Sequence, residues 1–127
     1  MNRYDTFDFT DSPSISADSL VVQIPGEISS AETLLEVLYE RARLPGYLGF
    51  NWNALSDCLR DLHWVECREV VLLHAGLPKL PLDQLRSYLD VLAESVASWT
   101  QGEAHSLKVV FPMAARVQVA DLAARGQ

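Results

Sequence analysis

The sequence predicts an α/β fold in which a small three-stranded parallel sheet is packed with helices. Three short apolar runs have the length of strands, at residues 20–24, 69–74 and 107–111. Segments with apolar residues at helical spacing separate these runs. Strands that alternate with helices are joined by crossover connections and lie parallel in one sheet. With 127 residues, the chain is expected to form one domain around one core.

The first strand is expected at Leu20–Ile24, because this β-branched run is ended by Pro25-Gly26. The following Ser29-Ser30-Ala31-Glu32 has the form of a capping box, in which a serine oxygen accepts from an unpaired amide and Glu32 reaches back. A first helix therefore starts here and ends before Pro45. The apolar residues that recur in it at helical spacing are Leu34, Leu35, Leu38 and Ala42.

Residues 44–50 are expected to form a loop, because they contain one proline and two glycines. Asn51 then caps a second helix that runs through Leu62. One face of this helix is apolar and holds Trp52, Leu55, Leu59 and Leu62. The opposite face is polar and holds Asn53, Ser56, Asp57, Arg60 and Asp61. The second helix is thus expected to bury one side and to present the other to solvent.

The second strand is expected at Glu69–His74, where a continuous apolar run indicates cover on both faces. Pro81 suits the start of a third helix, which Gly102 ends. The apolar stripe of this helix is expected in the core and consists of Leu85, Leu89, Leu92, Val96 and Trp99. Leu107–Phe111 is the third strand, and the Ala-rich tail, residues 112–127, is expected to contain one short helix.

Residues 1–19 form a polar N-terminal extension whose bulky apolar side chains are Tyr4, Phe7 and Phe9. The extension either drapes over the domain or stays mobile, and if it docks it could pair with a sheet edge or cover an apolar patch. Residues 1–40 carry a net charge of −7, whereas the rest of the chain has a net charge of zero. A basic partner should therefore be attracted to the N-terminal third first.

Charge and composition exclude several classes of protein. The net charge of −7 argues against direct nucleic-acid binding, which needs a basic surface. No apolar run has the length of a membrane span, and the acidic N-terminus does not resemble a secretory signal. Two cysteines are too few for a disulfide framework. These features predict a cytoplasmic protein with reduced thiols and no membrane partner.

The sequence contains no common motif for catalysis, nucleotide binding or zinc binding, so we expect no cofactor and no metal. Cys58 and His63 are five residues apart, so on a helix they would point to different faces and could not form a nucleophilic pair. Cys58 is therefore expected to be a buried structural thiol. His74 is expected to be a hydrogen-bonded histidine at a strand end. An enzyme that uses Cys58, His63 or Asp57 remains an alternative that the sequence does not favour.

The loop and the second helix resemble the characteristic pattern of the barstar family. That pattern runs Leu-Pro, Tyr, Gly, any residue, Asn, a hydrophobic residue, Asp, Ala-Leu and Asp-Cys-Leu, and residues 44–59 read LPGYLGFNWNALSDCL. A family Trp-Val-Glu is matched by Trp64-Val65-Glu66, two residues later than in the family. The resemblance covers residues 20–111 and implies the barstar fold.

The resemblance implies an intracellular inhibitor or immunity protein, whose loop and second helix block the basic active-site groove of a ribonuclease toxin. Asp57 matches the carboxylate that occupies the place of a substrate phosphate through charge-assisted hydrogen bonds. Tyr47 matches the loop tyrosine that stacks on a catalytic histidine of the enzyme, and Gly49 lets the loop turn tightly. Trp64 is expected either to contact the partner at the far edge of this surface or to pack in the core.

The chain departs from the family pattern at several positions. Asn53 stands where the family has a second aspartate, Ser56 where barstar has a tryptophan, and Phe50 where the family has an acid. Arg60 is spaced to pair with Asp57. The expected partner-binding residues are Tyr47, Gly49, Asn53, Ser56, Asp57, Arg60, Asp61 and Trp64. The alternative to a ribonuclease inhibitor is a barstar-like interaction module with a non-nuclease protein partner.

Overall fold

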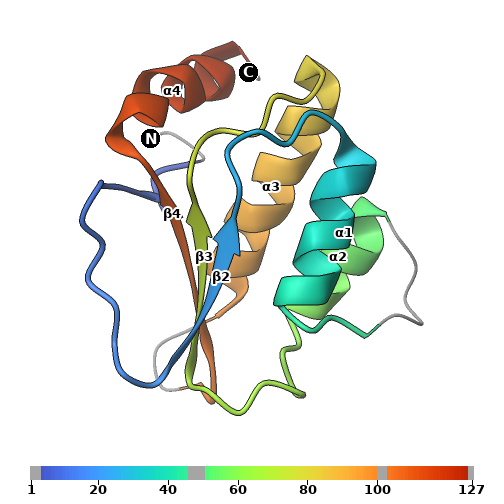
Figure 1. Cartoon of the computed structure of the whole chain (residues 1–127), viewed down its shortest axis with the longest axis vertical. Coiled ribbons are helices and arrows are strands. Elements are labelled where there is room, and N and C mark those ends of the chain that lie inside the picture. The colour runs from blue at the N-terminus through green and yellow to red at the C-terminus, as the bar shows by residue number, and fades with distance from the viewer. Residues whose placement is uncertain (1–3, 46–50, 100–102, 126–127) are drawn as a thin grey trace.

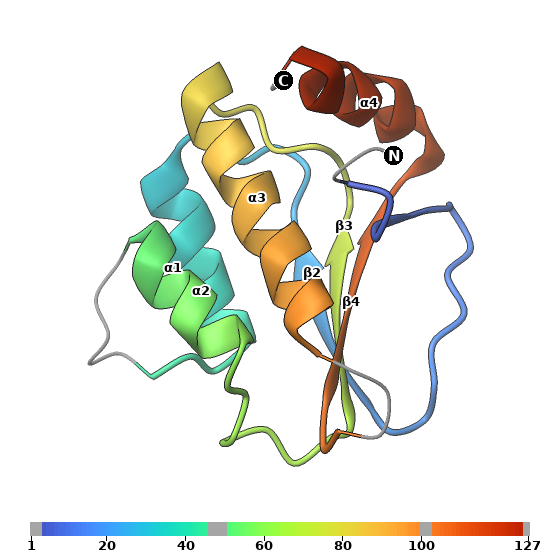
Figure 2. The same cartoon turned by 180° about the vertical axis from the view of Figure 1, so that it is seen from behind.

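The structure, a computed structural model, describes residues 4–45, 51–99 and 103–125. Its elements in chain order are β1 Asp8–Phe9, β2 Ser19–Ile24, α1 Ala31–Arg41, α2 Trp52–Leu59, β3 Glu69–His74, α3 Leu82–Ser98, β4 Ser106–Phe111, the 3₁₀ turn η2 Met113–Ala115, and α4 Arg116–Arg125. The helices α1, α2 and α3 lie on one side of the sheet, and α4 lies across the end at which β3 and β4 terminate (Figure 1, and from behind in Figure 2).

Within the described residues, the sheet has four parallel strands in the order β1-β4-β3-β2. The predicted α/β class and parallel sheet are confirmed. The three predicted strands form at their expected places. Val22 of β2 lies beside Leu72 of β3, which lies beside Val109 of β4. The prediction of only three strands is wrong, because β1 pairs with β4. A strand of two residues is too short to produce the alternating pattern by which strands are recognised in a sequence.

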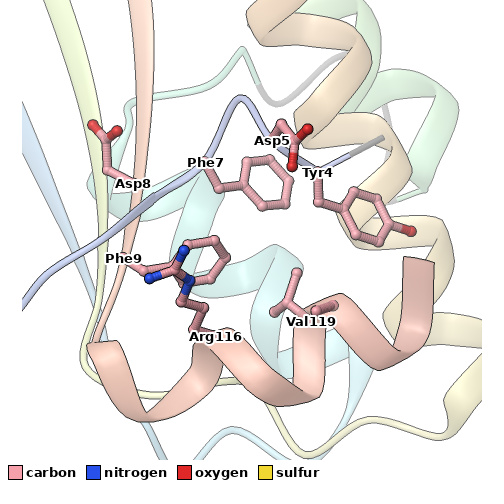
Figure 3. Close-up of a pocket in the computed structure, with 8 residues that line it drawn as sticks. Tyr4, Asp5, Phe7, Asp8, Phe9, Arg116 and Val119 are labelled. Atoms are coloured by element: carbon pink, nitrogen blue, oxygen red, sulfur yellow. The ribbon is translucent and has the colours of Figure 1, made fainter. Parts of the chain in front are cut away.

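The fourth strand comes from the N-terminal extension, which docks through aromatic side chains. Tyr4 and Phe7 are 2% and 4% exposed and belong to the core. The Tyr4 hydroxyl donates a 2.8 Å hydrogen bond to Asp90 Oδ1 on α3. Together with Phe9 they face Val119 of α4 around a cavity of about 420 Å³ (Figure 3). The expected alternative of pairing with a sheet edge is thus confirmed.

The core lies between the sheet and the three helices. Alternate residues of the long strands point toward the helices, and Val22, Leu72 and Val109 are fully buried. On α3, Leu85, Leu89 and Leu92 are buried as the stripe predicted. Val96 and Trp99, the last members of that stripe, are only partly buried.

The start of α1 differs by one residue from the predicted capping box. Ser30, not Ser29, is the N-cap, and its Oγ accepts a 3.2 Å hydrogen bond from the Thr33 amide. Glu32 therefore lies in the first turn, where its charge suits the positive end of the helix dipole. At the other end, the Leu44 amide donates to Tyr39 O, and this closing turn places Arg43 at a positive φ of 58°.

Candidate functional site

The helix α2 begins at its predicted position and ends earlier than predicted. Asn51 is the N-cap, and its side chain accepts a 2.8 Å hydrogen bond from the Ala54 amide. The helix ends at Leu59 instead of Leu62. Leu62 adopts a positive φ of 54° in the closing turn and is 1% exposed. The turn thus places Leu62 in the core, although no glycine or asparagine marks the end of the helix in the sequence.

Two tryptophan side chains fasten α2 to α3. The indole N–H of Trp52, the first residue of α2, donates a 3.0 Å hydrogen bond to Gln84 Oε1. The indole N–H of Trp99, which caps the end of α3, donates a 2.9 Å hydrogen bond to the main-chain oxygen of Leu59. Both ends of α2 are therefore held by specific contacts, in addition to the buried face that packs on α3.

The outer face of α2 and its closing turn form the candidate site, which we call the α2 surface. It consists of Asn53, Ser56, Asp57, Arg60 and Asp61. Ser56 is partly exposed, and the other four side chains are exposed. Spacings of three and four residues place the members of this set that belong to the helix on one side of it. The structure therefore brings together the five residues that the sequence pattern had placed on one polar face.

Charged side chains pair with one another on the α2 surface. Arg60 Nη2 donates to Asp57 Oδ1 at 3.2 Å, with the two side chains 50% and 66% exposed. Arg60 Nε also donates to the Ser56 carbonyl at 3.3 Å. Beside them, His63 Nδ1 lies 2.7 Å from Asp61 Oδ2. Such exposed pairs add little stability, but they restrict the positions of the carboxylates.

The remaining predicted site residues have different surroundings. Trp64 is partly buried against the core, and its indole N–H donates to the Ala42 carbonyl at 3.3 Å. Its ring contacts His63 edge-on, at a centroid distance of 5.4 Å. The indole N–H of Trp64 is therefore already hydrogen-bonded within the protein. Tyr47 and Gly49 lie outside the described residues, so their expected positions stay predictions.

The thiol of Cys58 lies on the buried side of α2 and is 1% exposed. Burial, together with the smaller effects of the Asp57 and Asp61 charges, raises the pKa of the Cys58 thiol to about 11. The thiol is therefore protonated at neutral pH, whereas a nucleophilic cysteine needs a thiolate. The prediction that Cys58 is buried is confirmed.

His74 lies in the core, where both ring nitrogens have partners. Nδ1 lies 3.0 Å from Val110 O, and Nε2 lies 2.7 Å from the Tyr88 hydroxyl. Because a carbonyl only accepts, Nδ1 carries the proton and Nε2 accepts the Tyr88 O–H. Burial lowers the pKa of His74 to about 4, so the ring is neutral at pH 7. The expected hydrogen-bonded histidine at a strand end is confirmed.

The contacts of Trp52, Trp99 and Tyr88 were not foreseen from the sequence. Trp52 and Trp99 appeared only as members of apolar stripes, which gave no sign of the hydrogen bonds that their indole groups make. Tyr88 lies next to a stripe residue and drew no attention, although it is fully buried and bonded to His74. A buried Trp or Tyr usually finds a hydrogen-bond partner for its polar atom, and this rule alone could have predicted such bonds from the sequence.

No group of three or more His, Cys, Asp or Glu side chains in the described part of the chain is arranged to hold a metal ion. None of the helices found between residues 4 and 125, outside the undescribed gaps, is long and apolar enough to cross a membrane.

Comparison with known proteins supplies a family. A family model described as "Barstar (barnase inhibitor)" matches residues 20–112. The match begins in β2 and ends just after β4, so it includes α1, α2 and α3 and omits the N-terminal extension and α4. A search of proteins with curated functions gave no significant match.

Proposed function

The chain belongs to the barstar family, and from that premise we propose that it is a protein inhibitor that binds a ribonuclease and blocks its active site with the α2 surface. The partner is a basic ribonuclease toxin, and the inhibitor acts in the cytoplasm of the cell that makes it. It works as a stoichiometric binder without a cofactor. Residues 20–112, which the family model matches, contain the whole α2 surface.

The observation that carries this proposal is the position of Asp57. Its side chain is 66% exposed on a helix whose two ends are fixed to α3. A ribonuclease collects Arg, Lys and His side chains around the substrate phosphate, and a carboxylate that enters this group forms charge-assisted hydrogen bonds with them. Because α2 is already rigid, little conformational entropy is lost when its carboxylate is bound.

The first test uses barnase, the ribonuclease that the family description names. Increasing amounts of wild type, Asp57→Ala and Asp121→Ala are added to barnase, and RNA cleavage is followed. Asp121 is the matched control, because it is an exposed aspartate on α4, outside the α2 surface. We expect stoichiometric inhibition by wild type and Asp121→Ala, and a loss of affinity of about 30-fold or more in Asp57→Ala.

The same comparison extends to the natural partner. Immobilised wild type and Asp57→Ala are exposed to extracts of the producing organism, and retained proteins are assayed for RNA cleavage. A basic ribonuclease that wild type retains and silences, and that Asp57→Ala loses, supports the proposal. Equal inhibition by wild type and Asp57→Ala would remove Asp57 from the mechanism.

One observation favours a second candidate, a barstar-like interaction module with a non-nuclease protein partner. Arg60 pairs with Asp57, and the neutral Asn53 is exposed one turn before it, so the α2 surface is less acidic than the family pattern implies. Such a mixed surface suits a partner that is less basic than a ribonuclease groove. Retention of a protein without RNA-cleaving activity, equally by wild type and Asp57→Ala, would favour this candidate.

A further inference from the structure

The strand β2 forms an open edge of the sheet. It is the outer strand opposite β1, and no strand pairs with its outer side within the residues that the structure places (Figure 1). At the opposite edge, β1 pairs with β4, and Lys108 of β4 donates to the Ser14 carbonyl of the N-terminal extension. Among the described residues, β2 therefore offers the longest stretch of strand that has no partner strand on one side.

Hydrogen bonds donated by β3 and by Ala75, the residue after it, show which backbone groups of β2 point outward. The Glu69 amide donates to Asp18 O, and the Ala75 amide donates to Ile24 O. Even-numbered residues of this segment thus direct their backbone groups toward β3. Because these directions alternate along a strand, Ser19, Val21 and Gln23 direct their amides and carbonyls toward the open side.

The residues of β2 do not themselves prevent pairing. The strand reads SLVVQI, without a charged residue or a proline. Charges, prolines and bulges are the usual features that keep an edge strand from pairing. A six-residue uncharged segment with β-branched residues is instead the type that pairs readily with a copy of itself.

A residue outside the strand closes this edge. Arg41, in the last turn of α1, extends to β2, and its Nη1 donates to the main-chain oxygen of Gln23. This bond occupies one of the outward-facing carbonyls. It also places a positive charge beside the open edge, where an incoming strand would have to lie.

We propose that the open edge of β2 is a pairing surface for a second copy of this chain, and that Arg41 keeps it closed by holding the Gln23 carbonyl. In a symmetric antiparallel pair centred on Val21, the Gln23 backbone faces Ser19 of the second copy. Outward-facing residues that lie opposite each other exchange both backbone hydrogen bonds. The pair therefore needs the Gln23 carbonyl of each copy, which Arg41 occupies.

The side chains also suit this register. On the helix-facing side of the sheet, Leu20 lies opposite Val22 of the second copy. Val22 is already fully buried within its own copy, so the partly buried Leu20 is the apolar residue that gains cover there. A hollow of about 210 Å³ opens beside Leu20 and is lined also by Ala42, Trp64 and Val65. On the other side of the sheet, Val21 meets Val21 of the second copy. Apolar and β-branched cross-strand pairs of this kind stabilise a sheet.

The test compares wild type, Arg41→Ala and the matched control Arg116→Ala by sedimentation equilibrium over a wide range of concentrations. Arg116, on α4, is exposed, carries the same charge, and lies outside both β2 and the hollow beside Leu20. We expect wild type and Arg116→Ala to be monomeric. In Arg41→Ala we expect the dimer dissociation constant to fall by about tenfold or more, because a charged hydrogen bond no longer competes for the carbonyl.

A second substitution identifies the surface. Val21→Lys places like charges opposite each other at the centre of the pair, so Arg41→Ala/Val21→Lys should be monomeric again. Hydrogen exchange should show slower exchange of the Val21 and Gln23 amides in the Arg41→Ala dimer than in its monomer. A folded Arg41→Ala that stays monomeric overturns the proposal, and so does a dimer that persists in the double variant. Circular dichroism and thermal unfolding establish that each variant is folded.

Discussion

The indole N–H of Trp99 donates a 2.9 Å hydrogen bond to the carbonyl oxygen of Leu59, the last residue of α2. The last carbonyls of a helix have no partner within it, so this bond satisfies one of them with a side chain from α3. The bond connects the C-terminal end of α3 to the C-terminal end of α2, the helix that presents Asp57.

Trp99→Phe removes this hydrogen bond while keeping most of the apolar ring. We expect the free energy of unfolding to fall by about 1 kcal/mol, measured by urea denaturation. We also expect faster hydrogen exchange at the amides of the turn after α2, because this end of the helix opens more easily. Exchange that is unchanged in this turn would show that the Trp99 bond does not hold α2.

Arg60→Ala tests whether the Asp57–Arg60 pair contributes to stability or to the rate of association with a partner. The pair is exposed, so we expect the free energy of unfolding to change by less than about 0.5 kcal/mol. Loss of the positive charge makes the α2 surface more acidic, so association with barnase should be faster and more sensitive to salt. Stopped-flow measurements at two ionic strengths check this. Slower association would mean that Arg60 itself contacts the partner.

His74 makes stability depend on pH in a defined range. Burial lowers its pKa in the folded protein to about 4, whereas a histidine of the unfolded chain titrates near about 6.5. Between these values the unfolded chain binds the proton more readily, so stability falls as the pH drops from about 6.5 toward 4. The contribution of neutral His74 to the free energy of unfolding is complete above about pH 6.5. By about pH 4.5 we expect this free energy to be lower by roughly 2 to 3 kcal/mol.

Urea denaturation at several pH values measures the pH effect. His74→Gln should flatten the pH dependence of stability. An NMR titration gives an independent check, since the His74 ring should not titrate above about pH 5. A titration of His74 near pH 6.5 in the folded protein would contradict the prediction.

Phe7→Ala tests whether the N-terminal extension is part of the core. Phe7 is 4% exposed and its ring lies 5.5 Å from the ring of Phe111. We expect the substitution to lower the free energy of unfolding by about 3 kcal/mol or more. Deletion of residues 1–18 should lower the melting temperature as well. Thermal unfolding that is the same with and without these residues would show that the extension is only a tail.

The elements that could be predicted from the sequence are those with a repeated pattern. Glu69–His74 was placed correctly because six consecutive residues carry the signal, and Asn51 because its type marks a helix start. Pairing of the N-terminal extension with a sheet edge was one expected alternative, but its partner β4 could not be predicted, since a contact across about 100 residues leaves no local pattern. The end of α2 was missed because a leucine occupies a turn conformation that usually indicates glycine.

The α2 surface was also predictable in part. Helical spacing placed Asp57, Arg60 and Asp61 on one side of a helix, and the family pattern singled out Asp57 among them. The direction of the Trp64 indole could not be derived, because it depends on the position of the Ala42 carbonyl in another part of the fold. Sequence patterns identify the face of an element, whereas tertiary packing decides which polar atoms remain available.

The place of β1 in the sheet has a consequence for the order in which the molecule is assembled. The first of the described strands in chain order pairs with the last, and the Asp11 carboxylate accepts from the Met113 amide, 102 residues further along the chain. During translation, Tyr4 and Phe7 therefore leave the ribosome long before β4 and α4 exist to cover them. The closing of this edge is expected to be the last and slowest step of folding.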